Sequence, residues 1–427
     1  MKMVLCFYMF ALCVAAQAAA PSGPALKKEP SANKGKTGKY KCSTSRAGYD
    51  YWVYVPPSYS EDNPAGLHLF FHGQGSQKSA EWFEHWFPFC NDHNLIAINM
   101  QYQDGDNTKD TPGKVAAARE AMAQTFADYK IVAGRGTVAS FSGGGVPHGL
   151  YFSESSKARG ADWPFNHLAL YSSNYRHPVP SGACSMSWFI TTGAAEWDMA
   201  QLGQTNTART VELLAAATKG GDADVFFKVI KGKGHSIDPA EVAESVKGFR
   251  RSDLAMAPFI YEPDHSEAPL ASIARQANAL QLKPALDACE SVLKGKAGDA
   301  VKKKAEKIKE RILDRAKRIV VVMKELSEQD PALCHFYSMK FAPQVSSLPE
   351  AKELQGLVQA ARGKPAFVRS LGFQQPFASA MKSMIATGGK LNATHAPLLE
   401  DIKKTCGENS QYGRMASDYL LLEPSAK

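Results

Sequence analysis

The sequence lacks the motifs with which many enzymes hold phosphates, nucleotides and metals. Its 427 residues contain no Gly-x-x-x-x-Gly-Lys-[Ser/Thr] loop and no Gly-x-Gly-x-x-Gly fingerprint, so the common phosphate- and dinucleotide-binding turns are not indicated. Cysteine is scarce, with eight residues, and no Cys-x-x-Cys pair or Cys/His cluster has the spacing of zinc ligands. We therefore expect no metal and no cofactor.

A long apolar run is missing as well. The segment Val4–Ala16 is apolar, but a membrane-spanning helix needs about 20 such residues. Lys2 precedes the segment and Ala16-Gln17-Ala18 ends it, which is the pattern of a cleavable signal peptide over residues 1–20. We therefore predict a secreted or periplasmic protein without a transmembrane segment.

Removal of a signal peptide would leave six cysteines in an oxidising compartment, where disulfides form. Three lie in each half of the chain, so pairing cannot be complete within each half. The sequence predicts either a disulfide that joins the halves or some free thiols. The six are Cys42, Cys90, Cys184, Cys289, Cys334 and Cys406.

Strong charge of either sign is also absent. The formal net charge is +8, and 22% of the residues are charged. No nucleic-acid-binding motif accompanies this modest basic excess, so we expect no nucleic-acid partner. The sequence does not indicate an oligomeric state.

What the sequence does contain is a series of short apolar runs that alternate with helical patterns. Runs rich in β-branched and aromatic residues predict strands, and Ala116–Tyr129 has the pattern of an amphipathic helix. The alternation favours an α/β fold, with a mostly parallel sheet and helices on both faces. The predicted strands are Tyr51–Val55, Leu67–Phe71, Leu95–Met100, Gly136–Ala139, Phe165–Tyr171, Met186–Thr192 and Val225–Ile230.

After about residue 258 the strand patterns stop and long helical patterns begin. Apolar residues recur at steps of three and four from Val301 to Met323, with basic residues between them, and Asp330-Pro331 is expected to end this helix. We interpret the region as a helical bundle with a solvated, mainly basic face. A surface for an anionic polymer or a membrane is the alternative, but interleaved acidic residues neutralise part of that face.

These changes along the chain predict four segments. Residues 1–20 form the signal peptide, and residues 21–39, rich in Pro, Ser, Gly and Lys, form a flexible leader. Residues 40–257 form the α/β domain, and residues 258–427 form an all-α C-terminal domain. A chain of this length is expected to hold about two domains.

The most informative stretch is Val138–Gly145, where a β-forming segment runs into small residues around Ser142. A serine nucleophile on a sharp strand-to-helix turn needs small residues two positions before and two positions after it. Ser140 and Gly144 occupy those positions. The alternative nucleophile, Ser140, would place the β-branched Val138 at one of them. Ser142 is therefore the predicted nucleophile.

Further motifs stand on either side of Ser142. His72-Gly73-Gln74-Gly75 follows an apolar run upstream, and Gly234-His235 follows another downstream. The chain order of nucleophile, acid and histidine is that of the α/β-hydrolases. Over roughly residues 40–255 the sequence resembles secreted α/β-hydrolase esterases, in particular the feruloyl-esterase and polyhydroxybutyrate-depolymerase-like group.

His235 is the predicted general base, because a flexible loop after the last strand carries it back over the sheet. The resemblance also implies the acid, which in the family commonly stands three residues after a glycine that matches Gly193. That position is Glu196. The usual residue there is aspartate, so Asp198 is the alternative acid. Either carboxylate would orient the imidazole and stabilise its charged form.

The oxyanion of such a reaction is stabilised by two backbone N–H groups. One would belong to Gly143, and the resemblance gives Gln74 as the other. Trp197, between the two candidate acids, and His72, in the oxyanion turn, are further candidates for the substrate pocket. A structural role is the alternative for His72.

The resemblance implies a secreted serine esterase that needs no cofactor and works through an acyl-enzyme. Its substrate would be a small or polymeric ester, either an acyl ester on a polysaccharide or a short-chain polyester. A serine peptidase of the prolyl-oligopeptidase type is one alternative, although such enzymes usually carry a large N-terminal propeller. A non-catalytic binding protein on the same fold is another, but the complete set of Ser142, His235 and an acid argues against it.

Overall fold

The computed structural model of the chain describes most of the sequence that follows the predicted signal peptide, which itself lies outside the described residues. The described residues are 28–74, 83–102, 109–155, 165–175, 186–193, 196, 224–367, 377, 380, 394–408 and 410–421.

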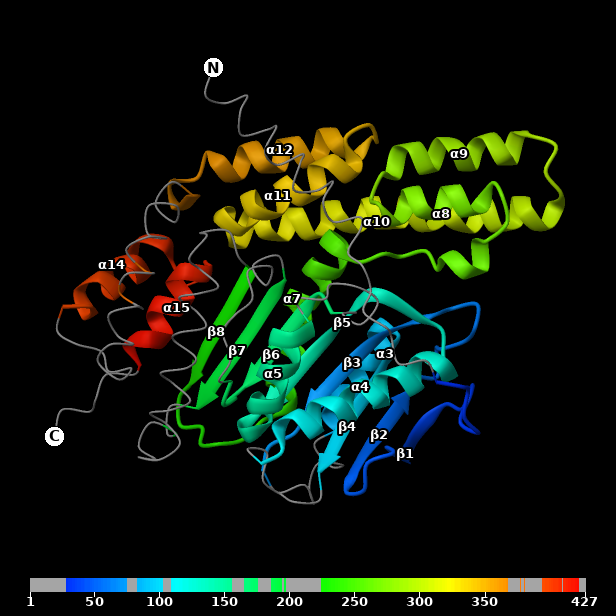
Figure 1. Cartoon of the computed structure of the whole chain (residues 1–427). Coiled ribbons are helices and arrows are strands. Elements are labelled where there is room, and N and C mark those ends of the chain that lie inside the picture. Colours follow the sequence, from blue (N-terminus) through cyan, green and yellow to red (C-terminus); the bar gives the residue numbers. More distant parts are fainter. Residues whose placement is uncertain are drawn as a thin grey trace.

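Within the described residues, eight strands form one sheet in the order β1-β2-β4-β3-β5-β6-β7-β8 (Figure 1). The pairs β1/β2 and β2/β4 are antiparallel, and the remaining pairs are parallel. This is the α/β-hydrolase fold. The strands are β1 (Gly38–Ser43), β2 (Tyr49–Val55), β3 (Ala65–Phe71), β4 (Leu95–Tyr102), β5 (Ile131–Phe141), β6 (His167–Tyr171), β7 (Ser187–Gly193) and β8 (Asp224–Ile230).

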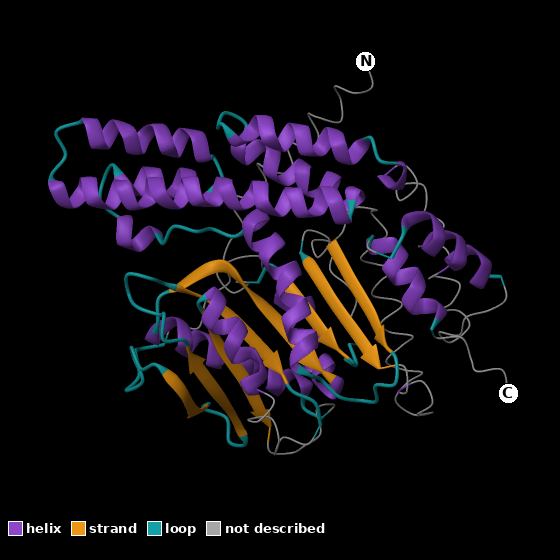
Figure 2. Cartoon of the chain, turned by 180° about the vertical axis from the view of Figure 1, so that it is seen from behind, coloured by secondary structure: helices purple, strands orange, loops and turns teal. Residues whose placement is uncertain are grey.

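Helices cover both faces of the sheet, as the alternating pattern predicts (Figures 1 and 2). One face packs against α4 (Thr111–Asp128) and α5 (Gly145–Ser155), and the other against α3 (Phe87–His93) and α7 (Pro239–Met256). Successive side chains of a strand point to opposite faces. In β3, accordingly, Leu69 and Phe71 join the first core, whereas Phe70 joins the second.

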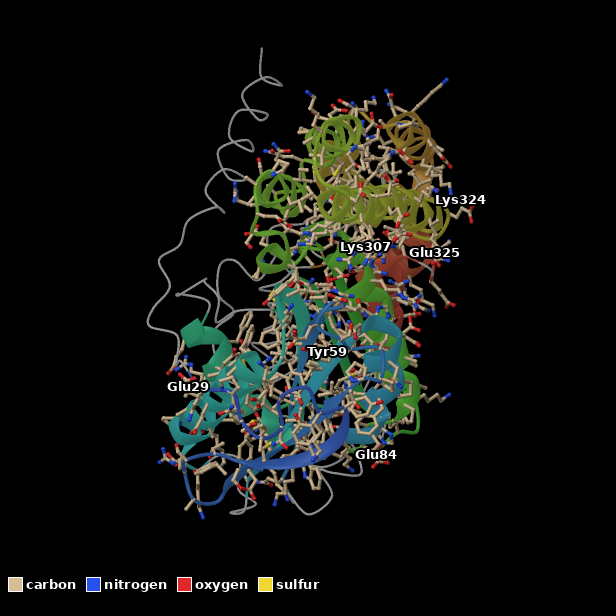
Figure 3. The ribbon with its side chains drawn as sticks, turned by 90° about the vertical axis from the view of Figure 1, so that its right-hand side faces the viewer. Glu29, Tyr59, Glu84, Lys307, Lys324 and Glu325 are labelled. Carbon is tan, nitrogen blue, oxygen red and sulfur yellow. The ribbon has the colours of Figure 1, made fainter. Side chains whose placement is uncertain are left out.

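In the described part of the C-terminal half, five helices form a bundle with a core of its own, and Figure 2 shows this bundle beside the sheet. The apolar positions of its longest helix are buried at the predicted spacing from Ala305 to Met323 and partly buried at Val301. Lys307, Lys324 and Glu325 of the same helix are exposed (Figure 3). Asp330 ends that helix and caps the next by accepting a hydrogen bond from the Leu333 N–H. The five are α8 (Leu270–Asn278), α9 (Leu282–Lys294), α10 (Asp299–Gln329), α11 (Pro331–Val345) and α12 (Glu350–Arg362).

The last two helices return to the sheet. The helices α14 (Ala396–Cys406) and α15 (Gln411–Leu420) bury Leu399, Ile402 and Met415 in the same core as α4 and α5. Figure 1 shows α14 and α15 beside the edge strand β8, apart from α8–α12. The domain limits drawn from the sequence stay a prediction, and the C-terminal helices contribute to both cores.

Three short 3₁₀ turns complete the described elements: η3 (Glu84–Trp86), η4 (Ser142–Gly144) and η8 (Glu262–His265).

Part of the predicted leader makes contacts with α4. The hydroxyl of Ser31 donates to Asp128 at 2.7 Å, and Lys28 pairs with Glu120 at 2.7 Å.

No helix in the described ranges has both the length and the apolar character required to cross a bilayer.

In Figure 1 the arrows of the parallel strands point away from the bundle, so the bundle lies at the amino ends of these strands. Two side-chain contacts agree. The hydroxyl of Tyr337 in α11 donates to Asp224, the first residue of β8, and Lys130, just before β5, pairs with Asp264 of η8. Ligands of open α/β sheets bind at the carboxyl ends of the strands. The bundle therefore stands at the opposite end of the sheet from the expected site.

Candidate active site

Ser142 lies on a strained turn at the carboxyl end of β5. The strand ends at Phe141, the turn η4 begins at Ser142, and α5 follows directly. The φ angle of Ser142 is +50°, a left-handed conformation that non-glycine residues seldom adopt. Ser140, the alternative nucleophile, lies inside β5 and is completely buried. The turn that the sequence predicts is therefore centred on Ser142.

Small residues are necessary where this turn meets its neighbours. A Cβ atom on Gly144 would stand 2.1 Å from the carbonyl oxygen of Phe71 and 2.4 Å from that of His72. Both neighbours are backbone atoms, so they have little freedom to move away. This close approach holds the start of α5 against the end of β3, and it explains the requirement for a small residue two positions after Ser142.

His235 contacts both Ser142 and Glu196. Its Nε2 lies 2.6 Å from Oγ of Ser142, and its Nδ1 lies 3.1 Å from Oε2 of Glu196. With a proton on Nδ1, the imidazole donates to Glu196 and its Nε2 accepts the hydroxyl proton of Ser142. The ring also stacks on Phe141, with the ring centres 4.9 Å apart. The side chain of His235 is 18% exposed, so the imidazole is accessible to solvent.

Glu196 is fully buried, and each of its carboxylate oxygens has its own partners. Oε2 faces His235, whereas Oε1 accepts hydrogen bonds from the Gly193 N–H at 3.0 Å and from the hydroxyl of Ser172. A buried carboxylate is costly unless it is paired and hydrogen-bonded, and these contacts supply both. Asp198, the alternative acid, and Trp197 lie outside the described residues.

The loop that carries His235 is held at both ends. A Cβ atom on Gly193 would stand 2.3 Å from the Lys233 carbonyl oxygen and 2.5 Å from that of Gly234, so the end of β7 packs directly on the loop. The ammonium group of Lys233 pairs with Glu241. Glu241 also closes the capping box at the start of α7 with Asp238, so the loop is tied to the helix that follows it.

The predicted oxyanion turn packs against the same serine. A Cβ atom on Gly73 would stand 3.0 Å from Cβ of Ser142, which places this turn directly beside the hydroxyl. Gln74 follows with an exposed side chain, and Gly143 is buried inside the elbow. His72 is only 1% exposed, and its ring lies 5.1 Å from that of Tyr102. It packs behind the turn.

Two further histidines lie close in sequence or space but do not contact Ser142. His148, on α5, lies 2.8 Å from the Ser140 hydroxyl through Nδ1, and complete burial lowers its pKa to about 3. It is therefore neutral at ordinary pH. His167 lies 2.6 Å from the Ser187 hydroxyl at the amino end of β7, and burial first of all lowers its pKa to about 3 as well.

The turn that follows β6 contacts the candidate site and was not predicted from the sequence. The hydroxyl of Ser172 donates to Glu196, the hydroxyls of Ser173 and Ser140 lie 2.8 Å apart, and the Asn174 N–H donates to the carbonyl oxygen of Ser142 at 2.7 Å. A signal was present, because three polar residues follow a buried strand at the carboxyl edge of a parallel sheet, where sites form.

No group of three or more His, Cys, Asp or Glu side chains in the described part of the chain is arranged to hold a metal ion. The sequence left open whether the six cysteines are paired or free. Free thiols are found at Cys42, Cys90, Cys289 and Cys334. Cys184 lies outside the described residues.

No protein-family model matches the sequence, and no curated protein matches it. Among solved structures, a thermostable esterase matches at 14% identity and a TM-score of 0.39, over 49% of this chain and 61% of its own. An acetyl xylan esterase from Aspergillus awamori matches at 12% identity and a TM-score of 0.39, over 50% of this chain and 98% of its own. A poly(3-hydroxybutyrate) depolymerase from Bordetella parapertussis matches at 14% identity and a TM-score of 0.35, over 52% of this chain and 89% of its own. Identities this low do not indicate a shared substrate.

Proposed function

We propose that this protein is a serine hydrolase that cleaves carboxylic esters, with Ser142 as nucleophile, His235 as general base and Glu196 as the acid. The observation that carries the proposal is the continuous path from Ser142 through His235 to Glu196, at 2.6 and 3.1 Å. A serine hydroxyl is a poor nucleophile unless an adjacent base takes its proton, and this path provides that base.

The reaction follows from the roles of these groups. Oγ of Ser142 attacks the ester carbonyl carbon while Nε2 of His235 takes its proton, and Glu196 stabilises the resulting imidazolium. His235 then gives the proton to the leaving alkoxide, and an acyl-enzyme remains. Water, activated by the same imidazole, attacks the acyl carbon and releases the acid and free Ser142.

The oxyanion in both steps would be stabilised by the backbone N–H groups of Gly143 and Gln74. The close approach of Gly73 to Ser142 supports this assignment. Each such donor is worth about 2.7–4 kcal/mol of transition-state stabilisation. Because the donors are backbone groups, replacement of the Gln74 side chain is expected to leave this contribution in place.

We propose further that the protein is exported through the signal peptide over residues 1–20, and that its substrates are acyl esters on polysaccharides or short-chain polyesters. Both proposals rest on the sequence motifs. Export is checked by the N-terminal sequence of the mature protein, which is expected to begin after the Ala16-Gln17-Ala18 site. The substrate is checked with feruloyl, acetyl-xylan and hydroxybutyrate esters.

Hydrolysis of p-nitrophenyl acetate and p-nitrophenyl butyrate tests the chemistry. We expect turnover in the wild type, labelling by a fluorophosphonate probe, and loss of both in Ser142→Ala. The matched control is Ser140→Ala, which removes the hydroxyl of the alternative nucleophile and is expected to keep the labelling. A folded wild type that neither turns over nor reacts with the probe would contradict the proposal, and labelling that depends on Ser140 would move the nucleophile.

A further inference from the structure

The turn after β6 contacts the candidate site at three points, one from each of its residues. Ser172 reaches the acid, Ser173 reaches the serine two positions before the nucleophile, and Asn174 reaches the carbonyl oxygen of Ser142 itself. A Cβ atom on Gly145 would stand 2.3 Å from the Ser173 hydroxyl oxygen. The turn therefore lies directly against the elbow on one side and against Glu196 on the other.

Of these contacts, that of Ser172 determines how Glu196 faces the imidazole. The carboxylate has two oxygens, and only Oε2 lies next to His235. The other oxygen is held by one backbone donor, the Gly193 N–H three residues earlier, and by the Ser172 hydroxyl from the turn after β6. Two donors from separate elements fix the plane of the carboxylate, which one local donor does not.

The backbone at Ser172 is strained in support of this contact. Its φ angle is +46°, a conformation that glycine adopts freely and that costs other residues roughly 1–2 kcal/mol. The Ser172 N–H donates to the Thr191 carbonyl oxygen at 2.7 Å, which ties the turn to the end of β7. Ser172 as a whole is 2% exposed, so its hydroxyl has little access to water as an alternative partner.

We propose that Ser172 is a positioning residue for the acid, and that its hydroxyl holds the Glu196 carboxylate in the orientation in which Oε2 faces Nδ1 of His235. The inference rests on the proposed function, which it extends by a fourth side chain. Ser172 does not touch the reacting atoms and acts only through Glu196.

The strained backbone offers a sharp test, since two substitutions separate the hydroxyl from the turn. Ser172→Ala removes the hydroxyl and keeps the strain, whereas Ser172→Gly removes the hydroxyl and relieves the strain. If the hydroxyl positions Glu196, both variants lower kcat by about 10- to 100-fold, the size expected for loss of a hydrogen bond to a charged group. The KM is expected to stay within about threefold, because Ser172 does not contact substrate.

Two further readouts distinguish positioning from a general loss of structure. The acidic limb of the kcat/KM profile, which reports protonation of the base, is expected to shift, because the carboxylate that stabilises the His235 imidazolium is no longer held in place. In a Glu196→Gln background, Ser172→Gly is expected to cost little additional activity, because its effect passes through the charge already removed. Ser187→Ala is the matched control. It removes another buried, hydrogen-bonded serine hydroxyl, at the amino end of β7, and is expected to leave kcat and the pH profile unchanged.

A third readout needs no substrate. The proton between His235 Nδ1 and Glu196 is expected to give a far-downfield proton NMR signal that Glu196→Gln abolishes and Ser172→Gly shifts or broadens. Wild-type kcat, pH profile and proton signal in Ser172→Gly would overturn the positioning role, even if Ser142→Ala is inactive. If the wild type has no turnover, the proposed function fails, and the proton signal alone decides whether Ser172 positions Glu196.

Discussion

Two serines among the residues that the structure describes adopt a left-handed backbone, and both lie at the candidate site. The described non-glycine residues with positive φ are Asn94, Asp110, Ser142, Ser172 and Leu280. Asn94 ends α3, Asp110 caps α4, and Leu280 lies in the connection between α8 and α9, which are places where such angles serve helix ends and turns. Ser142 and Ser172 instead follow directly after strands β5 and β6. Strain that helix capping does not explain is typical of functional sites.

At Glu196, replacement by glutamine is expected to lower kcat/KM by about 10³- to 10⁴-fold, close to the loss seen when a triad acid becomes an amide. The Gly193 and Ser172 donors both point at Oε1, so the amide oxygen is expected to take that place and the amide nitrogen to face His235. His235 must then accept at Nδ1, which puts its proton on Nε2 and leaves Ser142 without a base. Steady-state kinetics with p-nitrophenyl butyrate measure the effect.

Asp198→Asn serves as the control for that substitution. We expect it to retain most of the activity of the wild type, because Glu196 is the carboxylate that contacts His235. Near-normal kinetics in Glu196→Gln together with loss of activity in Asp198→Asn would reverse the assignment and make Asp198 the acid.

His68 gives a prediction for stability. Burial, with a smaller contribution from His167, lowers the pKa of His68 to about 3, against about 6.5 in the unfolded chain. Between these values the unfolded state binds a proton that the folded state does not, so stability falls as pH falls from about 6.5 to 3. Neither ring nitrogen has a hydrogen-bond partner in the described part of the chain, and the ring stacks on Trp86 with the centres 5.4 Å apart.

Replacement of His68 by phenylalanine keeps an aromatic ring and removes this titration. We expect the free energy of unfolding of His68→Phe, relative to the wild type, to improve by about 1.4 kcal/mol per pH unit as the pH falls through that window. Urea unfolding at pH 7.5, 6 and 5 measures the difference. An identical pH dependence in the two proteins would show that His68 takes up its proton in the folded state.

At the scale of single elements, the loop that carries His235 depends on a close contact with the end of β7. Gly193→Ala would place a Cβ atom 2.3 and 2.5 Å from two carbonyl oxygens of that loop, both of which must move. A displacement of about 1 Å at a reacting group costs roughly 10²-fold in rate, so we expect a loss of that size in kcat. Kinetics and circular dichroism together distinguish displacement from unfolding.

Gly234→Ala is the matched control, because it makes the same substitution next to His235. A Cβ atom on Gly234 meets nothing within 4 Å, so kcat is expected to stay within about threefold of the wild type. Equal losses in Gly193→Ala and Gly234→Ala would mean that loop flexibility, rather than the contact with β7, governs the position of His235.

Most elements of the sheet could be predicted from the sequence, because their strands are continuous apolar runs that both faces bury. The strand β1 was missed for a physical reason. It is an edge strand whose sequence, Gly38–Ser43, alternates lysines with other residues, and of its side chains only Tyr40 is buried. Lysines are common on edge strands, where they discourage pairing with other chains, but they hide the strand pattern.

Part of the candidate site could likewise be predicted from the sequence, and part could not. Ser142 and His235 follow from local patterns, a small-residue elbow and a glycine-rich loop, and the structure brings them together with Glu196. Ser172 did not follow, because its role depends on a contact with a residue 24 positions later in the chain. No local pattern encodes such a contact.

At the scale of the whole molecule, α7 links the candidate site to the helical bundle. It begins just after His235 and runs to the amino ends of the strands, where Arg315 of α10 donates to the carbonyl oxygens of Asp253 and Leu254 in its last turn. The bundle is therefore not a lid over Ser142. Its effect on the site is expected to be mainly one of stability, through the docking contacts at the far end of the sheet.

The central docking contact joins the buried Asp224 and Tyr337 to the partly buried Arg251, from β8, α11 and α7. Arg251 donates to both carboxylate oxygens of Asp224 at 2.8 Å, and the Tyr337 hydroxyl donates to Oδ2 at 2.6 Å. Burial alone would raise the pKa of Asp224, but the adjacent Arg251 charge outweighs it and the pKa is lowered. The contribution of the pair is therefore present at neutral pH and is lost as the pH falls through the lowered value.

Removal of the Tyr337 hydroxyl and removal of the Asp224 charge are expected to have unequal effects on stability. Tyr337→Phe leaves the ion pair intact and is expected to lower the free energy of unfolding by about 1.5–3 kcal/mol, the range for a hydrogen bond to a charged group. Asp224→Asn leaves the partly buried Arg251 without its counter-charge, and loss of the partner of a fully buried charge typically costs about 3–5 kcal/mol, so we expect a loss toward the lower end of that range. Urea unfolding at pH 7 measures both, and the deficit of Asp224→Asn is expected to shrink below about pH 4, where Asp224 takes up a proton in the unfolded chain but not yet in the folded protein. Because the cluster lies at the opposite end of the sheet from Ser142, the folded variants are expected to keep the wild-type kcat.

Two results would contradict this account of docking. Wild-type stability in Asp224→Asn would show that the bundle is held by its apolar contacts alone. A large loss of kcat in folded Tyr337→Phe would show that docking of the bundle reaches His235 through α7.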